Sequence, residues 1–175
     1  MDITNKVIVV QDFLSLEDCL AVEKNMPMVK RLDNGSSASP ESTNVKHPEI
    51  VKIIEKIDVK VFDLFSEMPL KKGTYICLYF QPGEKMRVHI DDMFNDTNEI
   101  LNCVVYTTNP LFYTGGIVYF PTLGIEIKPN QGSAIFFDPK LPHGVKEIID
   151  GDRFGITYNY LDAEKSSNWV PQINP

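Results

Sequence analysis

From residue 74 onward, short runs of β-forming residues alternate with turn-forming residues, and this alternation restricts the fold more than any other feature. Many short strands separated by glycine, proline and asparagine are typical of β-sandwiches and barrels. The predicted strands cover residues 74–80, 86–91, 100–108, 116–120, 124–128, 133–137, 144–149 and 153–161. About eight strands of this length favour a double-sheet jelly roll.

Two helices are expected before these strands. Ser15 is followed three residues later by Asp18, a pair typical of a helix N-terminus, and this helix is predicted to run to about Asn25. Across residues 48–68, isoleucine and other apolar residues recur at helical spacing. This stripe predicts a second helix with its apolar side against the core.

The remaining N-terminal segments are a predicted strand at residues 7–13 and a polar stretch at residues 31–48. The polar stretch is rich in serine and asparagine, which predicts a mobile loop. We therefore expect a mainly β fold with flanking helices (α+β), a double-stranded β-helix (jelly roll) with two N-terminal helices packed outside. No linker, repeat or low-complexity segment divides the chain, so residues 1–175 are expected to form a single domain.

His89, Asp91 and His143 form a pattern that predicts a metal site. Alternate residues of a β-strand point to the same face, so His89 and Asp91 can reach one ion from one strand. His143 lies far along the chain, as expected for a residue on a facing strand. Two imidazoles and one carboxylate are the facial triad of iron(II) sites, which leaves the opposite coordination positions open.

Arg153 follows His143 by ten residues and adds a fixed cation suited to bidentate binding of a carboxylate. Taken singly, each residue of the pattern has an ordinary interpretation as a surface, turn or strand-end residue. Their combination favours a site, because two of the three histidines in the chain fall in it. The third, His47, precedes Pro48 near the second predicted helix, and we interpret it as a surface or capping residue.

Composition restricts the cellular setting and the partners. The three cysteines, Cys19, Cys77 and Cys103, are scattered and odd in number, which predicts free thiols and a cytoplasmic location. A net charge of −7 counts against a nucleic-acid partner, because such proteins normally present a basic face. No apolar run has the length of a membrane span, and no leader-like segment opens the chain, so no membrane partner is expected. A monomer is the default expectation.

Taken together, these motifs resemble the iron(II)- and 2-oxoglutarate-dependent dioxygenases, in particular the prolyl 4-hydroxylase-like branch. The similar segments are residues 8–19, 79–91, 115–121, 132–145 and 153–162. Met86 departs from the pattern, since a tyrosine is usual shortly before the first metal histidine. The second arginine that nucleic-acid demethylases of this superfamily carry after the cosubstrate arginine is also absent, which again counts against a nucleic-acid substrate.

The resemblance implies that His89, Asp91 and His143 ligate iron(II) in a catalytic domain that spans the chain. It implies that Arg153 binds the distal carboxylate of the cosubstrate, 2-oxoglutarate. Tyr106 matches a tyrosine that shares this carboxylate in prolyl hydroxylases.

Two further cosubstrate contacts are expected from the resemblance. Thr157 matches a hydroxyl on the strand of the arginine, and residues 153 and 157 have the same strand parity. Tyr79 is the other candidate. For Tyr79 and Tyr106, a structural role as core aromatics stays open.

The implied chemistry is oxygen-dependent hydroxylation of a C–H bond, with release of succinate and carbon dioxide and with ascorbate as an optional reductant. A prolyl residue of a protein or peptide is the first expectation for the substrate, and a free amino acid or small metabolite is the alternative. Two other classes stay open: a catalytically silent jelly roll used for binding, and a cupin-like metal enzyme without an oxo-acid cosubstrate.

Overall fold

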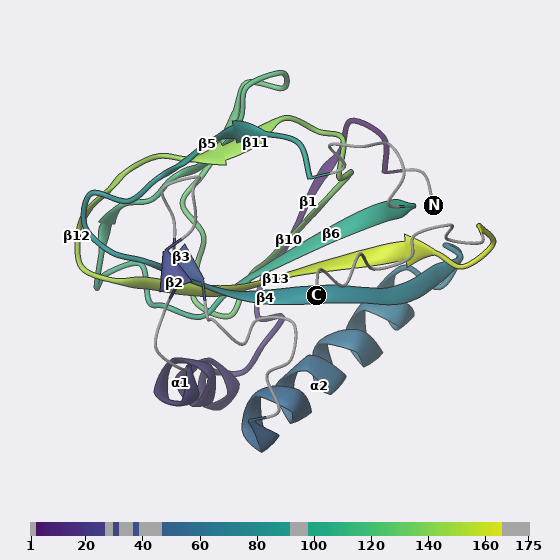
Figure 1. The fold of residues 1–175 in the computed structure, drawn as a ribbon, viewed down its shortest axis with the longest axis horizontal. Coiled ribbons are helices and arrows are strands. Elements are labelled where there is room, and N and C mark those ends of the chain that lie inside the picture. Colours follow the sequence, from purple (N-terminus) through teal and green to yellow (C-terminus); the bar gives the residue numbers. More distant parts are fainter. Residues whose placement is uncertain (1–2, 27–29, 32–36, 39–46, 92–97, 166–175) are drawn as a thin grey trace, which may run out of the picture.

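The computed structural model describes residues 3–26, 30–31, 37–38, 47–91 and 98–165 (Figure 1). This part of the chain is mainly β-structure with two helices, and its strands pair in antiparallel fashion. The mainly β prediction with two N-terminal helices is therefore confirmed.

The larger sheet has seven strands, and the long strands at its centre come from the second half of the chain and from the segment after the second helix. In spatial order they are β1 (Val7–Val10), β10 (Ala134–Phe137), β6 (Glu99–Tyr106), β13 (Arg153–Asp162), β4 (Leu70–Phe80), β3 (Ser37–Ala38) and β2 (Lys30–Arg31). Their continuous β-branched and aromatic residues suit strands that are covered on both faces.

A four-stranded sheet and a two-stranded ribbon complete the β-structure. The four strands are β5 (Met86–His89), β11 (His143–Val145), β8 (Val118–Phe120) and β9 (Ile125–Ile127), and the ribbon pairs β12 (Ile148–Asp150) with β7 (Thr114–Gly115). In Figure 1, β5 and β11 lie across from the central strands of the larger sheet. Residues 144–149, predicted as one strand, are divided between β11 and β12.

Both predicted helices form, and both lie on the same side of the larger sheet (Figure 1). In α1 (Leu16–Asn25), Ser15 caps the helix, because its hydroxyl accepts a hydrogen bond of 3.1 Å from the backbone N–H of Asp18. In α2 (Pro48–Leu64), proline opens the helix, where its missing N–H costs nothing. His47 stands at the N-cap position, exposed and without a side-chain capping bond.

Side-chain alternation divides the central strands between two environments. The isoleucine stripe of α2 packs against one face of the sheet. Cys77 of β4, Cys103 of β6 and Ile156 of β13 point to this face. The alternate residues of β4, β6 and β13 point away from the helices, toward β5 and β11. The three cysteines are free and buried.

One buried polar contact joins the helix to the sheet within this core. Asp58 of α2 is buried, forms an ion pair with Lys72 of β4 at 2.6 Å, and accepts a hydrogen bond of 3.1 Å from the hydroxyl of Tyr160. Because the carboxylate is paired and hydrogen-bonded, its burial does not leave an unsatisfied charge.

The mobile loop predicted at residues 31–48 lies mostly outside the described residues. Within the described part of the chain, neither helix is long and apolar enough to span a bilayer.

Replacing Ile57 tests the packing of α2, because this side chain is fully buried against the sheet. We expect Ile57→Ala to lower the free energy of unfolding by about 2–5 kcal/mol, from lost burial and the cavity left behind. Val59→Ala on the same helix is the matched control, since Val59 is 71% exposed and should change stability by less than about 0.5 kcal/mol. Urea denaturation of both variants measures the difference, and equal losses would contradict this packing.

Candidate metal centre

Strand pairing brings the two predicted metal histidines together. β5 and β11 are antiparallel neighbours, and His89 lies directly opposite His143 in their register. The centres of the two imidazole rings are 4.3 Å apart. Asp91 follows just after β5, and its backbone N–H donates a 2.9 Å hydrogen bond to the carbonyl of Pro139, which fixes the chain there.

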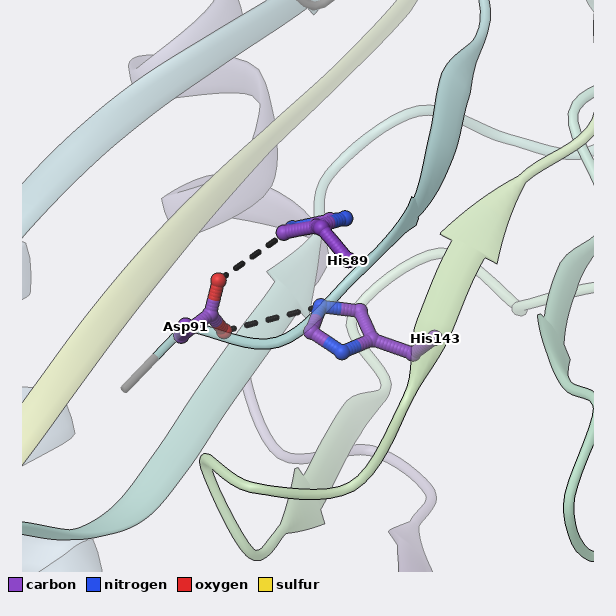
Figure 2. A group of neighbouring side chains, drawn as sticks. All are labelled: His89, Asp91 and His143. Carbon is purple, nitrogen blue, oxygen red and sulfur yellow. Dashed lines mark ion pairs between the residues drawn. The ribbon is translucent and has the colours of Figure 1, made fainter. Parts of the chain in front are cut away.

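The carboxylate of Asp91 faces both imidazoles (Figure 2). Its Oδ1 lies 3.2 Å from Nε2 of His89, and its Oδ2 lies 3.5 Å from Nε2 of His143. All three residues offer a ligand atom within 4.8 Å of the others, so one ion can be reached by all of them. Two nitrogens and one hard oxygen suit iron(II) in a facial arrangement.

Backbone carbonyls set the tautomer of both imidazoles. Nδ1–H of His89 donates to the carbonyl of Arg87 at 2.9 Å, and Nδ1–H of His143 donates to the carbonyl of Leu141 at 3.0 Å. A carbonyl oxygen only accepts, so the proton of each neutral ring is on Nδ1 and the lone pair of Nε2 is free. This is the ring orientation that metal-binding histidines use.

Burial and the carboxylate act in opposite directions on the two imidazoles. His143 is buried beside Phe137, with ring centres 4.5 Å apart, and burial lowers the pKa of this imidazole although Asp91 opposes the change. Burial also acts to lower the pKa of His89, but hydrogen bonds with Asp91 and the Arg87 carbonyl raise it overall. A metal ion bound between these groups displaces protons from the ligands.

Asn102 orients the carboxylate of Asp91, and the sequence interpretation missed this residue. This residue is fully buried on β6, and its side-chain N–H donates to Oδ2 of Asp91. The signal was present in the sequence, because Asn102 is a polar residue in an apolar strand and shares its parity with Tyr106.

A cavity of about 200 Å³ joins the triad to the other predicted site residues. Arg153, Tyr106 and Thr157 all line it, together with His89, Asp91 and His143. Its remaining lining is largely apolar. The structure therefore brings six of the seven predicted site residues to one cavity.

Arg153 is buried in this cavity without an acidic partner among the described residues. Its side chain is anchored by Nη1–H, which donates to the carbonyl of Gly116 at 2.8 Å, and its Cζ lies 4.4 Å from the ring centre of Phe80. Burial lowers the pKa of Arg153, and only the nearby phenols Tyr106 and Tyr113 act against this. A buried cation without a counter-charge is costly, so an anionic ligand would stabilise it strongly.

The structure does not bring Tyr79 into the cavity. Its ring stacks on Phe154 with centres 4.6 Å apart, and its hydroxyl accepts a 3.1 Å hydrogen bond from Gln81. Phe80 and Arg153 are cross-strand partners, so strand alternation turns Phe80 toward the arginine and Tyr79 to the other face. The aromatic ring below the cation is therefore Phe80.

Comparison with known proteins gives one family. The sequence model of the 2OG-Fe(II) oxygenase superfamily matches residues 74–161, just over half of the chain. No curated protein sequence matches the chain.

Several solved structures share the fold at low sequence identity. A viral collagen prolyl hydroxylase from Paramecium Bursaria Chlorella virus-1, in a 2OG complex, is 21% identical with a TM-score of 0.65, over 88% of this chain and 94% of that chain. A Trichoplax adhaerens prolyl hydroxylase, in complex with a hypoxia-inducible-factor peptide fragment, is 16% identical with a TM-score of 0.70, over 91% and 84%. A Pseudomonas putida prolyl-4-hydroxylase is 16% identical with a TM-score of 0.63, over 89% and 91%.

The histidines offer a direct test of the metal centre. We expect His143→Ala to weaken iron(II) binding by more than about 100-fold, because loss of an outer partner alone typically costs about 10–100-fold. His47→Ala is the matched control, since His47 is exposed and lies outside the cavity. Anaerobic calorimetric titration with iron(II) measures both affinities, and equal affinities would show that His143 is not a ligand.

Asn102 is predicted to matter through the carboxylate that it holds. We expect Asn102→Ala to weaken iron(II) binding by about 10–100-fold, because Asp91 loses its orienting donor. Asn159→Ala is a matched control, since Asn159 is the cross-strand partner of Asn102 and also donates its amide to a carboxylate, that of Glu99, which is not a metal ligand. If the two variants bind iron(II) equally well, Asn102 does not orient Asp91.

Proposed function

This chain belongs to the 2OG-Fe(II) oxygenase superfamily, and from that premise we propose that it hydroxylates a prolyl residue of a protein or peptide. It is an iron(II)- and 2-oxoglutarate-dependent dioxygenase, with 2-oxoglutarate and oxygen as cosubstrates. The observation that supports the 2-oxoglutarate chemistry is the buried Arg153, which has no acidic partner among the described residues and lies in the same cavity as the His89, Asp91 and His143 triad.

The donor set fits iron(II), and His89, Asp91 and His143 would hold it. Bound iron(II) supplies oxygen activation coupled to the oxidative decarboxylation of 2-oxoglutarate, with succinate and carbon dioxide as products. The Asp91 carboxylate offsets part of the positive charge of the ion, and the carbonyls of Arg87 and Leu141 keep both imidazoles in the ligating tautomer.

Arg153 would orient the cosubstrate by its distal carboxylate. The guanidinium is fixed by Gly116 and by the ring of Phe80, so little side-chain freedom is lost on binding. Tyr106 and Thr157 line the same cavity and would offer hydroxyl groups to the same end of the ligand. Apolar lining around these groups excludes water and strengthens the charge pair.

The fold and the substrate class are proposed on the basis of the solved relatives. We infer that the two sheets form a double-stranded β-helix in a single domain, as the antiparallel pairing and the shared fold suggest. A prolyl residue is supported by the fold shared with prolyl hydroxylases, one of them in complex with a peptide. A cytoplasmic location, a monomeric state and ascorbate as reductant stay predictions.

Binding of 2-oxoglutarate by the anaerobic iron(II) protein tests the proposal. The metal-to-ligand charge-transfer band should appear for the native chain, and Arg153→Ala should weaken 2-oxoglutarate binding by about 30-fold or more. Truncating one partner of a buried charge pair costs about 2–5 kcal/mol, which sets this magnitude. Arg87→Ala is the matched control, because Arg87 is exposed and does not line the cavity.

The outcomes separate the candidate classes. A band followed by succinate release with proline-containing peptides would support the proposed substrate, and release with free amino acids alone would favour a metabolite hydroxylase. Iron binding without a band would favour a cupin-like metal enzyme. A chain that does not bind iron would be a binding module.

A further inference from the structure

The hydroxyl of Tyr113 is buried and has no hydrogen-bond partner among the described residues. The residue is only 3% exposed and lies directly before β7. Buried hydroxyls in folded proteins nearly always have a partner, so one without a partner calls for an explanation. Neither the metal triad nor the residues matched to cosubstrate binding include Tyr113.

The ring of Tyr113 packs beside the arginine end of the cavity. It belongs to the same buried cluster as Leu78 and Met86, which line the cavity, and as Phe80, which faces Arg153. It also lies against Gly116, where an added Cβ would be 3.1 Å from a ring carbon of Tyr113.

Gly116 connects this ring to the cation. Its carbonyl accepts the 2.8 Å hydrogen bond from Arg153, so the residue that anchors the guanidinium is the one on which Tyr113 packs. The charge of Arg153 acts to lower the pKa of both Tyr113 and Tyr106, and Tyr113 acts to raise the pKa of Tyr106.

Two cations lie near Tyr113, and the described residues offer its hydroxyl no acceptor within hydrogen-bond distance. Nζ of Lys128 lies 3.4 Å from the ring centre of Tyr113 and donates to the carbonyl of Gly115 at 2.7 Å. Guanidinium and ammonium groups only donate hydrogen bonds, so neither Arg153 nor Lys128 can accept from the phenol. Burial raises the pKa of Tyr113 although Arg153 opposes the change, so the hydroxyl keeps its proton and remains a donor at neutral pH.

We propose that Tyr113 donates its hydroxyl to the same carboxylate that Arg153 binds, and that it thereby selects for oxo acids with a second acid group. This inference rests on the proposed function, since it names a further cosubstrate-binding residue at that site. An anionic acceptor beside Arg153 satisfies the orphaned hydroxyl and neutralises the buried cation together. Lys128 covers one face of the ring and helps to hold the phenol in this position.

Tyr113→Phe tests the proposal, because it removes the hydroxyl and keeps the ring that packs on Gly116. The probes are 2-oxoglutarate and 2-oxobutanoate, which share the metal-chelating group but differ in the distal carboxylate. Binding is followed by the charge-transfer band of the anaerobic iron(II) protein. We expect at least about 10-fold weaker binding of 2-oxoglutarate, from loss of a hydrogen bond to a charged group, with unchanged binding of 2-oxobutanoate and of iron(II).

Tyr119→Phe is the matched control, because the ring of Tyr119 lies against Gly144, whereas the ring of Tyr113 lies against Gly116, the residue that anchors Arg153. Equal affinity of the native chain and Tyr113→Phe for 2-oxoglutarate would overturn the inference. Equal losses for both acids would also overturn it, because they would assign Tyr113 a packing role. If the native chain binds iron(II) but not 2-oxoglutarate, the proposed function fails first, and that outcome is distinct from both.

Discussion

The site depends on one constraint, the alternation of side chains on the three central strands β4, β6 and β13. On β13, Ile156 faces the helices, while Arg153 and Thr157 face the cavity. On β6, Cys103 and Val105 pack on the helical side, while residues of the other parity face the metal side. Because α2 must bury its isoleucine stripe on one face of this sheet, only the other face is left for chemistry.

The second sheet closes the site and carries the metal ligands. The β5–β11 pair places His89 opposite His143, and the carbonyls of Arg87 on β5 and of Leu141 just before β11 fix the ring tautomers. Backbone pairing holds the two strands side by side and the carbonyl bonds hold both rings, so the imidazoles are preorganised before an ion binds. Asp91 is held by the Pro139 carbonyl and by Asn102, which belongs to the larger sheet. The metal centre therefore joins the two sheets.

The two ends of the cavity carry opposite charges, so a ligand with two different ends can bind in only one orientation. The Asp91 end carries an anionic ligand set suited to a divalent cation, and the Arg153 end carries a buried cation without a carboxylate among the described residues. A ligand that chelates a metal at one end and bears an anionic group at the other satisfies both ends together. The phenols of Tyr106 and Tyr113 lie near the arginine and stay protonated, because burial raises the pKa of each.

The sequence by itself determined the element types and the four charged or metal-binding residues, because periodicity and the spacing of rare polar residues are local signals. The spacing of His89 and Asp91 predicted that both reach one metal ion, and they do, although β5 ends at His89 and Asp91 lies beyond the strand. The parity of residues 153 and 157 predicted that both face the cavity. Tertiary structure decided the rest, since cross-strand register turned Phe80, and not Tyr79, toward Arg153. It also brought Asn102 to Asp91, and it brought Tyr113 to Gly116, the residue that anchors Arg153. These contacts depend on how the strands pair, and no local sequence pattern encodes that pairing.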